Sequence, residues 1–202
     1  MRKVDMIVDL QYGSTGKGLI AGYLAEKHGY DCVVNANMPN AGHTYIDDKG
    51  QKMIHKVLPN GVVSPNCRAV LIGPGSVFSI DQLILEVEQA RKFGYMKNAN
   101  VFIHQNAVPL QEQHKIAEEP FASIGSTKQG SGAALIHKIM RDPNDRVIAR
   151  DIQIATSKYL GITTVTPTSY RHILGNAERI LAEGAQGFSL GISEQFYPYC
   201  TS

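Results

Sequence analysis

Glycine, hydroxyl and lysine side chains gather near the start of the chain in Gly13-Ser14-Thr15-Gly16-Lys17-Gly18. A β-rich apolar run at residues 4–9 precedes this segment, and a helix is expected to follow at residues 19–28. Glycines between a strand and a helix let backbone N–H groups approach an anion, while the helix N-terminus and Lys17 add positive charge. The segment therefore predicts a phosphate-binding loop. An ordinary glycine-rich turn is the alternative, because the spacing departs from that of the standard P-loop.

A second polar loop, Asn40-Ala41-Gly42-His43-Thr44, follows a short apolar strand expected at residues 31–35. It offers an amide, an accessible backbone, an imidazole and a hydroxyl, each of which can contact a polar ligand. Imidazole is the commonest general acid or base, so His43 is a candidate catalytic residue. A single histidine in a loop is also often a surface or capping residue, and the residues alone leave both interpretations open.

Two later segments carry weaker signals. Ser126-Thr127-Lys128-Gln129-Gly130 could bind an anion, but its composition favours a flexible loop that carries a lysine. Glu183-Gly184-Ala185-Gln186-Gly187 follows an expected strand, and the amide of Gln186 could read the edge of a base because it offers both a donor and an acceptor. An exposed turn is the simpler interpretation of that segment. His55, inside an expected hairpin, is interpreted as structural or peripheral rather than catalytic.

Strand and helix patterns alternate along the chain, which predicts an α/β fold with a mostly parallel central sheet and flanking helices. An additional β-hairpin is expected at residues 43–57, around the turn at 47–50. Further strands are expected at residues 69–72, 101–104 and 179–182, and helices at 80–93 (with Ser79 as N-cap), 133–141 and 151–159. In such a sheet the loops at the strand ends hold the ligand. No linker or repeat divides the chain, so residues 1–202 are expected to form a single α/β domain.

The 202 residues carry 20 basic and 18 acidic side chains, a formal net charge of +2. This balance argues against a dedicated binder of nucleic acid or of an anionic membrane, although nucleotide-sized ligands remain possible. The three cysteines, Cys32, Cys67 and Cys200, are widely spaced and form no zinc pattern, which fits a reducing, cytoplasmic setting. No apolar run approaches the length of a membrane span, and the first residues lack a signal-peptide core, so neither export nor a membrane partner is expected.

In this order the motifs resemble those of the adenylosuccinate synthetase family, which run Gly-Asp-Glu-Gly-Lys-Gly, Asn-Ala-Gly-His-Thr, His-x-x-Pro-Ser-Gly, Ile-Gly-Thr-Thr and Glu-Gly-Ala-Gln-Gly. The similar segments here are residues 13–18, 40–44, 55–61, 124–127 and 183–187, and the tail at 197–202 is similar to the family's Tyr-Pro-x-Val-Thr-Ser. The resemblance implies the P-loop-related fold of that family. Family chains continue into an aspartate-binding loop and a segment that reads the base of the triphosphate. The 202 residues are therefore expected to be the N-terminal part of a longer family chain.

The resemblance implies a ligase that forms a C–N bond between L-aspartate and carbon 6 of a purine nucleotide. In that chemistry the 6-oxygen attacks the γ-phosphate of a triphosphate, and the aspartate amine then displaces the 6-phosphoryl group. The triphosphate is expected to be ATP, with GTP or dATP as possible substitutes. Lys17 would stabilise the transferring phosphate together with loop amides and Mg²⁺, since phosphoryl transfer depends on positioning and charge neutralisation. His43 is similar in position to the catalytic acid of the family.

The resemblance also implies a role for each matching residue. Ser14, Lys17 and His43 match catalytic positions, and the hydroxyl of Ser14 and the carbonyl of Gly42 match positions that ligate the metal. Contacts to nucleotide and phosphate match Gly13, Ser14, Thr15, Gly16, Lys17, Gly18, Gly42, His43 and Thr44. Contacts to the purine monophosphate match Asn40, Ser126, Thr127, Arg141, Gln186 and Thr201. Arg141 lies where the family sends an arginine across a homodimer to the partner subunit's substrate phosphate, so a homodimer is expected.

Ser14 departs from the family pattern. The family has an aspartate at this position, which acts as the general base for the N1 proton of the purine, whereas a serine hydroxyl is neutral near pH 7. Either the activity is lost or the substrate differs. A shorter side chain beside N1 leaves room for a 2-amino group on the purine. The loop also resembles that of the bacteriophage branch of the family, which uses dGMP, L-aspartate and ATP on the route to 2-aminoadenine DNA.

The expected reaction is therefore the condensation of dGMP with L-aspartate to 2-amino-2′-deoxy-N6-succinyladenylate, in the host cytoplasm if the chain is encoded by a phage. One alternative is an IMP-using adenylosuccinate synthetase with a variant base. A second is a catalytically inactive, nucleotide-binding fragment. A third, based on the phosphate loop alone, is a kinase-like phosphotransferase, which would turn over without aspartate.

Overall fold

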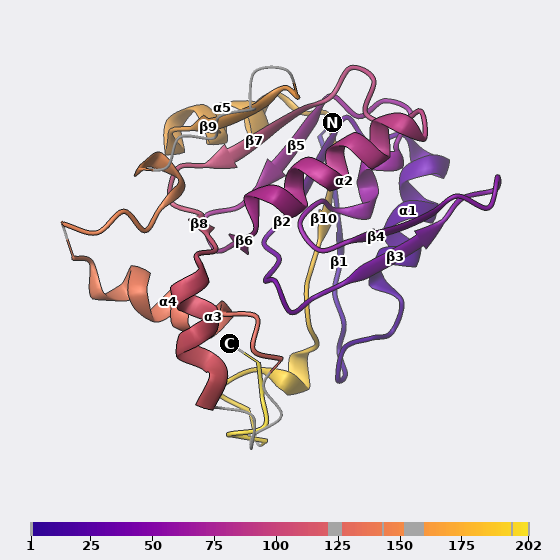
Figure 1. Cartoon of the computed structure of the whole chain (residues 1–202). Helices are drawn as coiled ribbons and strands as arrows, with labels where there is room; N and C mark the ends of the chain where they lie inside the picture. Colours follow the sequence, from indigo (N-terminus) through magenta and orange to yellow (C-terminus); the bar gives the residue numbers. More distant parts are fainter. Residues whose placement is uncertain (1, 121–126, 143, 152–159, 195, 202) are drawn as a thin grey trace.

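The computed structural model describes residues 2–120, 127–142, 144–151, 160–194 and 196–201 (Figure 1). Its centre is a parallel six-stranded sheet with the strand order β1-β10-β2-β5-β7-β9. These strands are β1 (Lys3–Ile7), β2 (Cys32–Asn35), β5 (Ala69–Ile72), β7 (Asn100–His104), β9 (Ile162–Val165) and β10 (Arg179–Glu183). The expected α/β class with a mostly parallel central sheet is confirmed.

Two small sheets and several helices surround the central sheet. The antiparallel hairpin of β3 (His43–Ile46) and β4 (Lys52–His55) is the one expected from the sequence, and β6 (Val77–Phe78) pairs in parallel with β8 (Val108–Pro109). The described α-helices are α1 (Lys17–His28), α2 (Ile80–Lys92), α3 (Glu112–Glu118), α4 (Ser131–Met140) and α5 (Pro167–Asn176). Within the described residues, no helix combines the length and the apolar character that crossing a membrane requires.

Helices cover both faces of the central sheet, which explains why its inner strands are short apolar runs. On one face α1 and α2 pack against the sheet (Figure 1), and the buried core there includes Ala21, Ala25, Val33, Val70, Leu83, Val87, Val101 and Leu181. On the opposite face α5 packs against Cys32, Leu71 and Ile180. A smaller apolar cluster packs α4 against β6 and β8, so α4 lies beside this two-stranded sheet.

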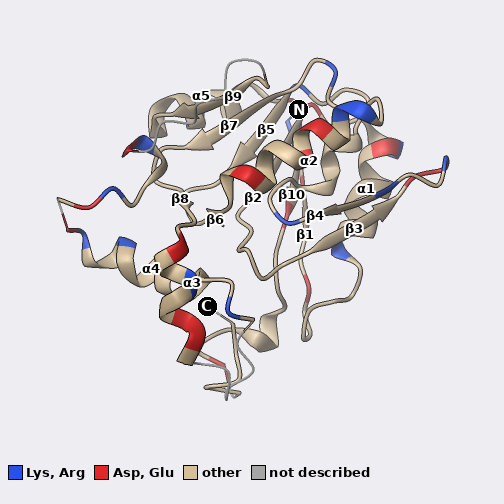
Figure 2. Ribbon diagram, in the orientation of Figure 1, with Lys and Arg blue, Asp and Glu red and all other residues tan. Residues whose placement is uncertain are grey.

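The start and end of α2 follow from its own sequence. Ser79 caps the helix as expected, because its hydroxyl accepts a hydrogen bond from the backbone N–H of Gln82 at 3.3 Å. Asp81 lies in the first turn, and Arg91 and Lys92 lie in the last turn (Figure 2). This distribution complements the helix dipole, which favours negative charge at the N-terminus and positive charge at the C-terminus.

The first helix begins closer to the phosphate loop than the sequence predicted. α1 starts at Lys17 rather than at residue 19, and Gly29 ends it in the left-handed conformation with φ 66°. Gly16 precedes the helix with φ 90°, a conformation that glycine adopts at little cost. Lys17 therefore stands in the first helical turn, where backbone N–H groups have no partner within the helix.

The sequence analysis did not predict α3, β9 or α5. In α5 the buried residue is Tyr170, and the start of the helix is marked by Thr166 and Pro167 rather than by an apolar stripe. β9 has only four residues, two of them threonine. The helix expected at residues 151–159 lies outside the described residues, apart from Asp151 at the end of a 3-10 helix (Ala149–Asp151).

The packing of α2 generates a stability prediction. Leu83 is fully buried in the main core, whereas Leu85 on the same helix is 60% exposed. Leu83→Ala is expected to lower the free energy of unfolding by roughly 2–5 kcal/mol because it leaves a cavity, and Leu85→Ala by about 0.5 kcal/mol or less. Urea denaturation of the two variants measures the difference. An equal loss in both would contradict the observed orientation of α2.

Candidate active site

Three polar loops meet at one edge of the central sheet. β1, β10 and β2 lie side by side and run parallel, so the segments that follow them leave the sheet at the same edge. Backbone hydrogen bonds join the first two segments, from Gly184 N to Ile7 O at 3.0 Å and from Phe188 N to Asp9 O at 2.9 Å. The Glu183–Gly187 motif therefore lies directly beside the phosphate loop.

The phosphate loop has the backbone conformation that glycine permits. Gly13 and Gly16 have φ of 83° and 90°, and Ser14 between them also has a positive φ of 54°. A Cβ atom added to Gly187 would lie 2.3 Å from the backbone nitrogen of Gly13, so this contact between the two motifs requires glycine. Ser14, Thr15 and Gly16 are exposed, which leaves the tip of the loop open to a ligand.

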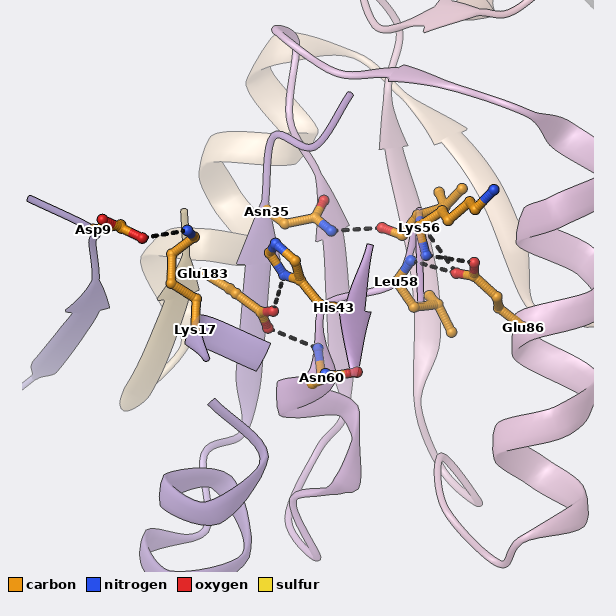
Figure 3. A network of polar contacts seen from close by, with 10 residues as sticks. Asp9, Lys17, Asn35, His43, Lys56, Leu58, Asn60, Glu86 and Glu183 are labelled. Carbon is orange, nitrogen blue, oxygen red and sulfur yellow. Dashed lines mark hydrogen bonds and ion pairs between the residues drawn. The ribbon is translucent and has the colours of Figure 1, made fainter. Parts of the chain in front are cut away.

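Lys17 is buried at the base of this loop and is paired with Asp9 (Figure 3). Its Nζ atom lies 3.2 Å from Oδ2 of Asp9, and the Thr15 hydroxyl donates to the same oxygen. The backbone N–H of Gln11 donates to Oδ1 of Asp9 at 2.8 Å. The Thr15 hydrogen bond, with the Gln11 N–H and Lys17, lowers the pKa of Asp9 to about 2. The sequence analysis predicted Lys17 but did not identify its carboxylate partner.

His43 is also paired with a buried carboxylate. Its Nδ1 atom contacts Oε1 of Glu183, and the other oxygen of Glu183 accepts a hydrogen bond from the backbone N–H of Asn60 at 2.7 Å (Figure 3). The side chain of Glu183 is completely buried. A carboxylate on Nδ1 fixes the orientation of an imidazole and stabilises its protonated form. Nε2 is then the ring nitrogen that can exchange a proton with a ligand.

Glu183 is a site residue that the sequence analysis missed. Glu183 is the first residue of the 183–187 motif, of which the sequence analysis considered only Gln186. An acidic residue at the end of an apolar strand was the signal that could have identified it. Buried carboxylates are rare unless they are paired, so an acid in this position indicates a partner. The partner, His43, is 140 residues away in the chain, and sequence spacing could not identify it.

The lysine loop and the histidine are in direct contact. A Cβ atom added to Gly18 would lie 2.7 Å from Cβ of His43 and 2.5 Å from Nδ2 of Asn60. This packing explains why the residue after Lys17 is glycine, where a standard P-loop has Ser or Thr. It brings two of the three predicted catalytic residues, Lys17 and His43, onto neighbouring backbone segments.

Two buried polar side chains, Glu86 and Asn35, hold residues 56–58, which follow the β3–β4 hairpin. Glu86 on α2 accepts hydrogen bonds from the backbone N–H groups of Lys56, Val57 and Leu58 at 2.7–3.0 Å (Figure 3). Burial raises the pKa of Glu86, and these hydrogen bonds partly oppose that rise. Asn35 at the end of β2 donates to the carbonyl of Val57 at 2.5 Å. The segment that resembles the third family motif is therefore fixed to the sheet and to α2.

A cavity of about 1020 Å³ adjoins these loops. Asn40, Thr127, Gln186 and Thr201 all line it, as four of the six residues predicted to contact the purine monophosphate. Asn40 donates to the hydroxyl of Thr201 at 3.1 Å, across 161 residues of sequence. The structure thus brings together residues that the sequence analysis connected only by resemblance. Ser126 lies outside the described residues.

Arg141 lies in a different place from those four residues. It ends α4 with φ 55°, is exposed, and lines a second cavity of about 880 Å³ together with Lys138 and Arg146. It is not among the residues that line the larger cavity. The partner-subunit role of Arg141 stays a prediction.

Helices α3 and α4 form one wall of the larger cavity, and polar contacts hold them together. Nε2 of His114 lies 3.0 Å from Nδ1 of His137, whose Nε2 lies 2.7 Å from the carboxylate of Asp145. Glu118 accepts hydrogen bonds from Gly130 N, Gly132 N and Ala133 N at 2.7–3.2 Å and so caps the N-terminus of α4. The sequence analysis found no partner for these histidines, because 23 residues separate them.

The site offers oxygen donors of the kind that Mg²⁺ prefers. Ser14 and Gly42, the two predicted metal ligands, are both exposed. The described residues contain no group of three or more His, Cys, Asp or Glu side chains that could hold a metal alone. A hydroxyl and a backbone carbonyl are both oxygen donors, and an open set of this kind suits Mg²⁺, which binds together with substrate phosphates rather than in an all-protein cage.

A parallel sheet with a glycine-rich loop at the carboxyl end of β1 and a large cavity beside it defines a nucleotide-binding α/β protein. The sequence model of the family described as adenylosuccinate synthetase matches residues 6–150, and the chain belongs to that family.

The relatives include several phage proteins. The N6-succino-2-amino-2′-deoxyadenylate synthase of Vibrio phage phiVC8 is 55% identical over 205 residues, which are 100% of this chain and 59% of the relative. The protein of the same name from Acinetobacter phage SH-Ab 15497 is 44% identical over 226 residues, which are 100% of this chain and 58% of the relative. The chain thus spans less than two thirds of the length of these curated relatives.

A solved structure is also similar to this chain. It is the cyanophage S-2L succinoaminodeoxyadenylate synthetase (PurZ) bound to dGMP and dATP as an energy donor. It aligns with a TM-score of 0.88 at 35% identity, over 100% of this chain and 56% of that chain.

His55 generates a pH prediction. It lies opposite His43 in the hairpin and is fully buried, in keeping with a structural role, and this burial lowers its pKa from 6.5 to about 4. The unfolded chain therefore binds a proton at His55 between pH 6.5 and 4 that the folded chain does not, and the free energy of unfolding falls as the pH is lowered through this window. His55→Gln should remove roughly 3 kcal/mol of this pH dependence.

Urea denaturation of the wild type and His55→Gln at several pH values between 7 and 4 measures this effect. The matched control is His172→Gln on α5, since His172 is exposed and should leave the pH dependence almost unchanged. The same slope in the wild type and in His55→Gln would contradict the prediction.

Proposed function

We propose that this chain carries the nucleotide-binding and phosphoryl-transfer part of a ligase that condenses dGMP with L-aspartate. The product is 2-amino-2′-deoxy-N6-succinyladenylate, a precursor of 2-aminoadenine DNA, and ATP hydrolysis through a 6-phosphoryl intermediate drives the reaction. The observation that carries the proposal is the meeting of three features at one sheet edge. These are the Lys17 loop, the His43–Glu183 pair and the cavity lined by four predicted monophosphate contacts.

The names of the relatives support the choice of substrate. Two phage relatives are named N6-succino-2-amino-2′-deoxyadenylate synthase, and the similar solved structure contains dGMP and dATP. Ser14 agrees with this choice, because its short side chain leaves room for the 2-amino group of guanine. ATP is the proposed energy donor, and dATP and GTP are the alternatives.

The phosphate loop is proposed to hold the triphosphate. The backbone of residues 13–16, exposed at 14–16, and the N-terminus of α1 would bind the phosphate oxygens, and Lys17 would leave Asp9 to neutralise charge on the γ-phosphate. Mg²⁺, when bound by the Ser14 hydroxyl and the Gly42 carbonyl, would supply further neutralisation of phosphate charge. Gly18 and Thr44 complete the nucleotide-binding set that the family resemblance implies.

His43 is proposed to be the catalytic acid. Glu183 holds its Nδ1 and stabilises the imidazolium, so that Nε2 can donate a proton or a hydrogen bond to the 6-oxygen as negative charge develops there. The other oxygen of Glu183 accepts the backbone N–H of Asn60, which fixes the carboxylate against His43. Glu183 thus acts through His43 as a positioning residue.

The larger cavity is proposed to hold the purine monophosphate. Asn40, Thr127 and Thr201 would contact it through amide and hydroxyl groups, with Gln186 at the end of β10 reading the base. Ser126 and the partner subunit's arginine corresponding to Arg141 are assigned to the same nucleotide through the family resemblance. This assignment makes the active unit a homodimer.

A coupled assay of ADP and phosphate release tests the proposed function. The assay uses this chain and any longer chain that contains it, with ATP, Mg²⁺ and either dGMP or IMP, in the presence and absence of L-aspartate. Turnover that requires both dGMP and aspartate is the expected result. Turnover that requires aspartate and occurs with IMP but not with dGMP would identify an ordinary adenylosuccinate synthetase. Turnover without aspartate would identify a phosphotransferase. Nucleotide binding without any turnover would identify an inactive fragment.

Ser14→Asp tests the steric explanation of substrate choice. The longer, charged side chain would occupy the space proposed for the 2-amino group and restore the family's base, so kcat/KM should shift from dGMP toward IMP by about tenfold or more. The shift is measured as the ratio of kcat/KM for the two nucleotides. Ser169→Asp, exposed in the first turn of α5, introduces the same group away from the phosphate loop and should leave that ratio unchanged. An unchanged ratio in Ser14→Asp would remove the steric explanation.

A further inference from the structure

Asp9 lies just before the phosphate loop. It is the one carboxylate among residues 8–16, between the end of β1 and the start of α1. Both of its oxygens are engaged within the loop, by Gln11 N, the Thr15 hydroxyl and Lys17 Nζ. A carboxylate at this point lies where the phosphates of a nucleotide must approach Lys17. Its negative charge would repel those phosphates unless it took a cation as a partner.

The predicted metal ligands lack a charged oxygen. Ser14 offers a hydroxyl and Gly42 a backbone carbonyl, and both groups are neutral. Nucleotide-bound Mg²⁺ is usually held by at least one carboxylate in addition to phosphate oxygens. Glu183 cannot provide it, because its oxygens are held by His43 and Asn60 N in a fully buried position. Asp9 is bonded to Thr15, the residue next to Ser14, and is the acidic group that the loop itself supplies.

We infer that Asp9 exchanges partners when a triphosphate binds. In the structure, its carboxylate is the counter-ion of Lys17. When the terminal phosphate engages Lys17, Asp9 is released and becomes the charged oxygen ligand of the nucleotide's Mg²⁺. This inference rests on the proposed function only in requiring a triphosphate at this loop, and it is independent of dGMP and of aspartate.

The exchange predicts opposite effects of Asp9 with and without the metal. In EDTA, Asp9 competes with the phosphates for Lys17, so Asp9→Asn should bind ATP more tightly than the wild type. With saturating Mg²⁺, the wild type gains a ligand that the variant lacks. The increase in ATP affinity on adding Mg²⁺ should therefore be at least about tenfold smaller in Asp9→Asn. A purely structural brace would weaken ATP binding equally under both conditions.

Isothermal titration calorimetry with ATP, in EDTA and in Mg²⁺, measures the four affinities. The matched control is Asp5→Asn, because Asp5 on β1 carries the same charge but is bonded to Tyr30 at 2.6 Å, away from the loop. It should leave the Mg²⁺ enhancement unchanged, and Asp9→Glu should retain most of it. If Asp9→Asn does not fold, Mn²⁺ in the wild-type ATP complex should broaden the carboxyl ¹³C signal of Asp9 more than that of Asp5.

The same Mg²⁺ enhancement in the wild type and in Asp9→Asn, or equal broadening of the two carboxyl signals, would overturn the exchange while leaving ATP binding and the proposed function intact. Absence of ATP binding by the wild type under both conditions would instead overturn the proposed function, and the exchange with it.

Discussion

Three parallel strands, β1, β10 and β2, pair side by side, and the candidate site depends on this pairing because it places their carboxyl ends at one edge of the sheet. β10 enters the sheet between two strands that precede it by more than 140 residues. Its insertion brings Glu183 level with Ile7 and Asn35 in the strand register. From this row Glu183 reaches His43, and the following residues pack against the phosphate loop. No local interaction within any of the three loops could produce this arrangement.

Buried carboxylates fix the loops once the strands have brought them together. Burying a charge is costly unless hydrogen bonds and opposite charges compensate for lost hydration. Asp9, Glu86, Glu118 and Glu183 are all buried, and each is satisfied mainly by backbone N–H groups or by a basic side chain. Each carboxylate therefore determines the path of a loop or helix end around the site. The contact of Glu183 with His43 holds the imidazole in one orientation, as the proposed role of His43 requires.

The parts of the fold that could be predicted are those in which local sequence and tertiary structure agree. The strand Ala69–Ile72, the Ser79 cap of α2 and the β3–β4 hairpin were all predicted, because apolar runs and turn residues mark them without reference to the rest of the chain. α5 was missed, since its sequence is polar and its stability comes from packing on a sheet that the local pattern does not reveal. Short β9 was missed for the same reason.

The sequence by itself determined which chemical groups the site contains. Residue type and position made the phosphate loop and His43 candidates, and the resemblance of the ordered motifs to the family predicted the amide and hydroxyl contacts. Only the tertiary structure decided which side chains contact these groups. The Glu183–His43 and Asn40–Thr201 contacts join residues 140 and 161 positions apart. Side-chain pairing over such separations depends on strand order and register, and those depend on the packing of the whole sheet rather than on any local pattern.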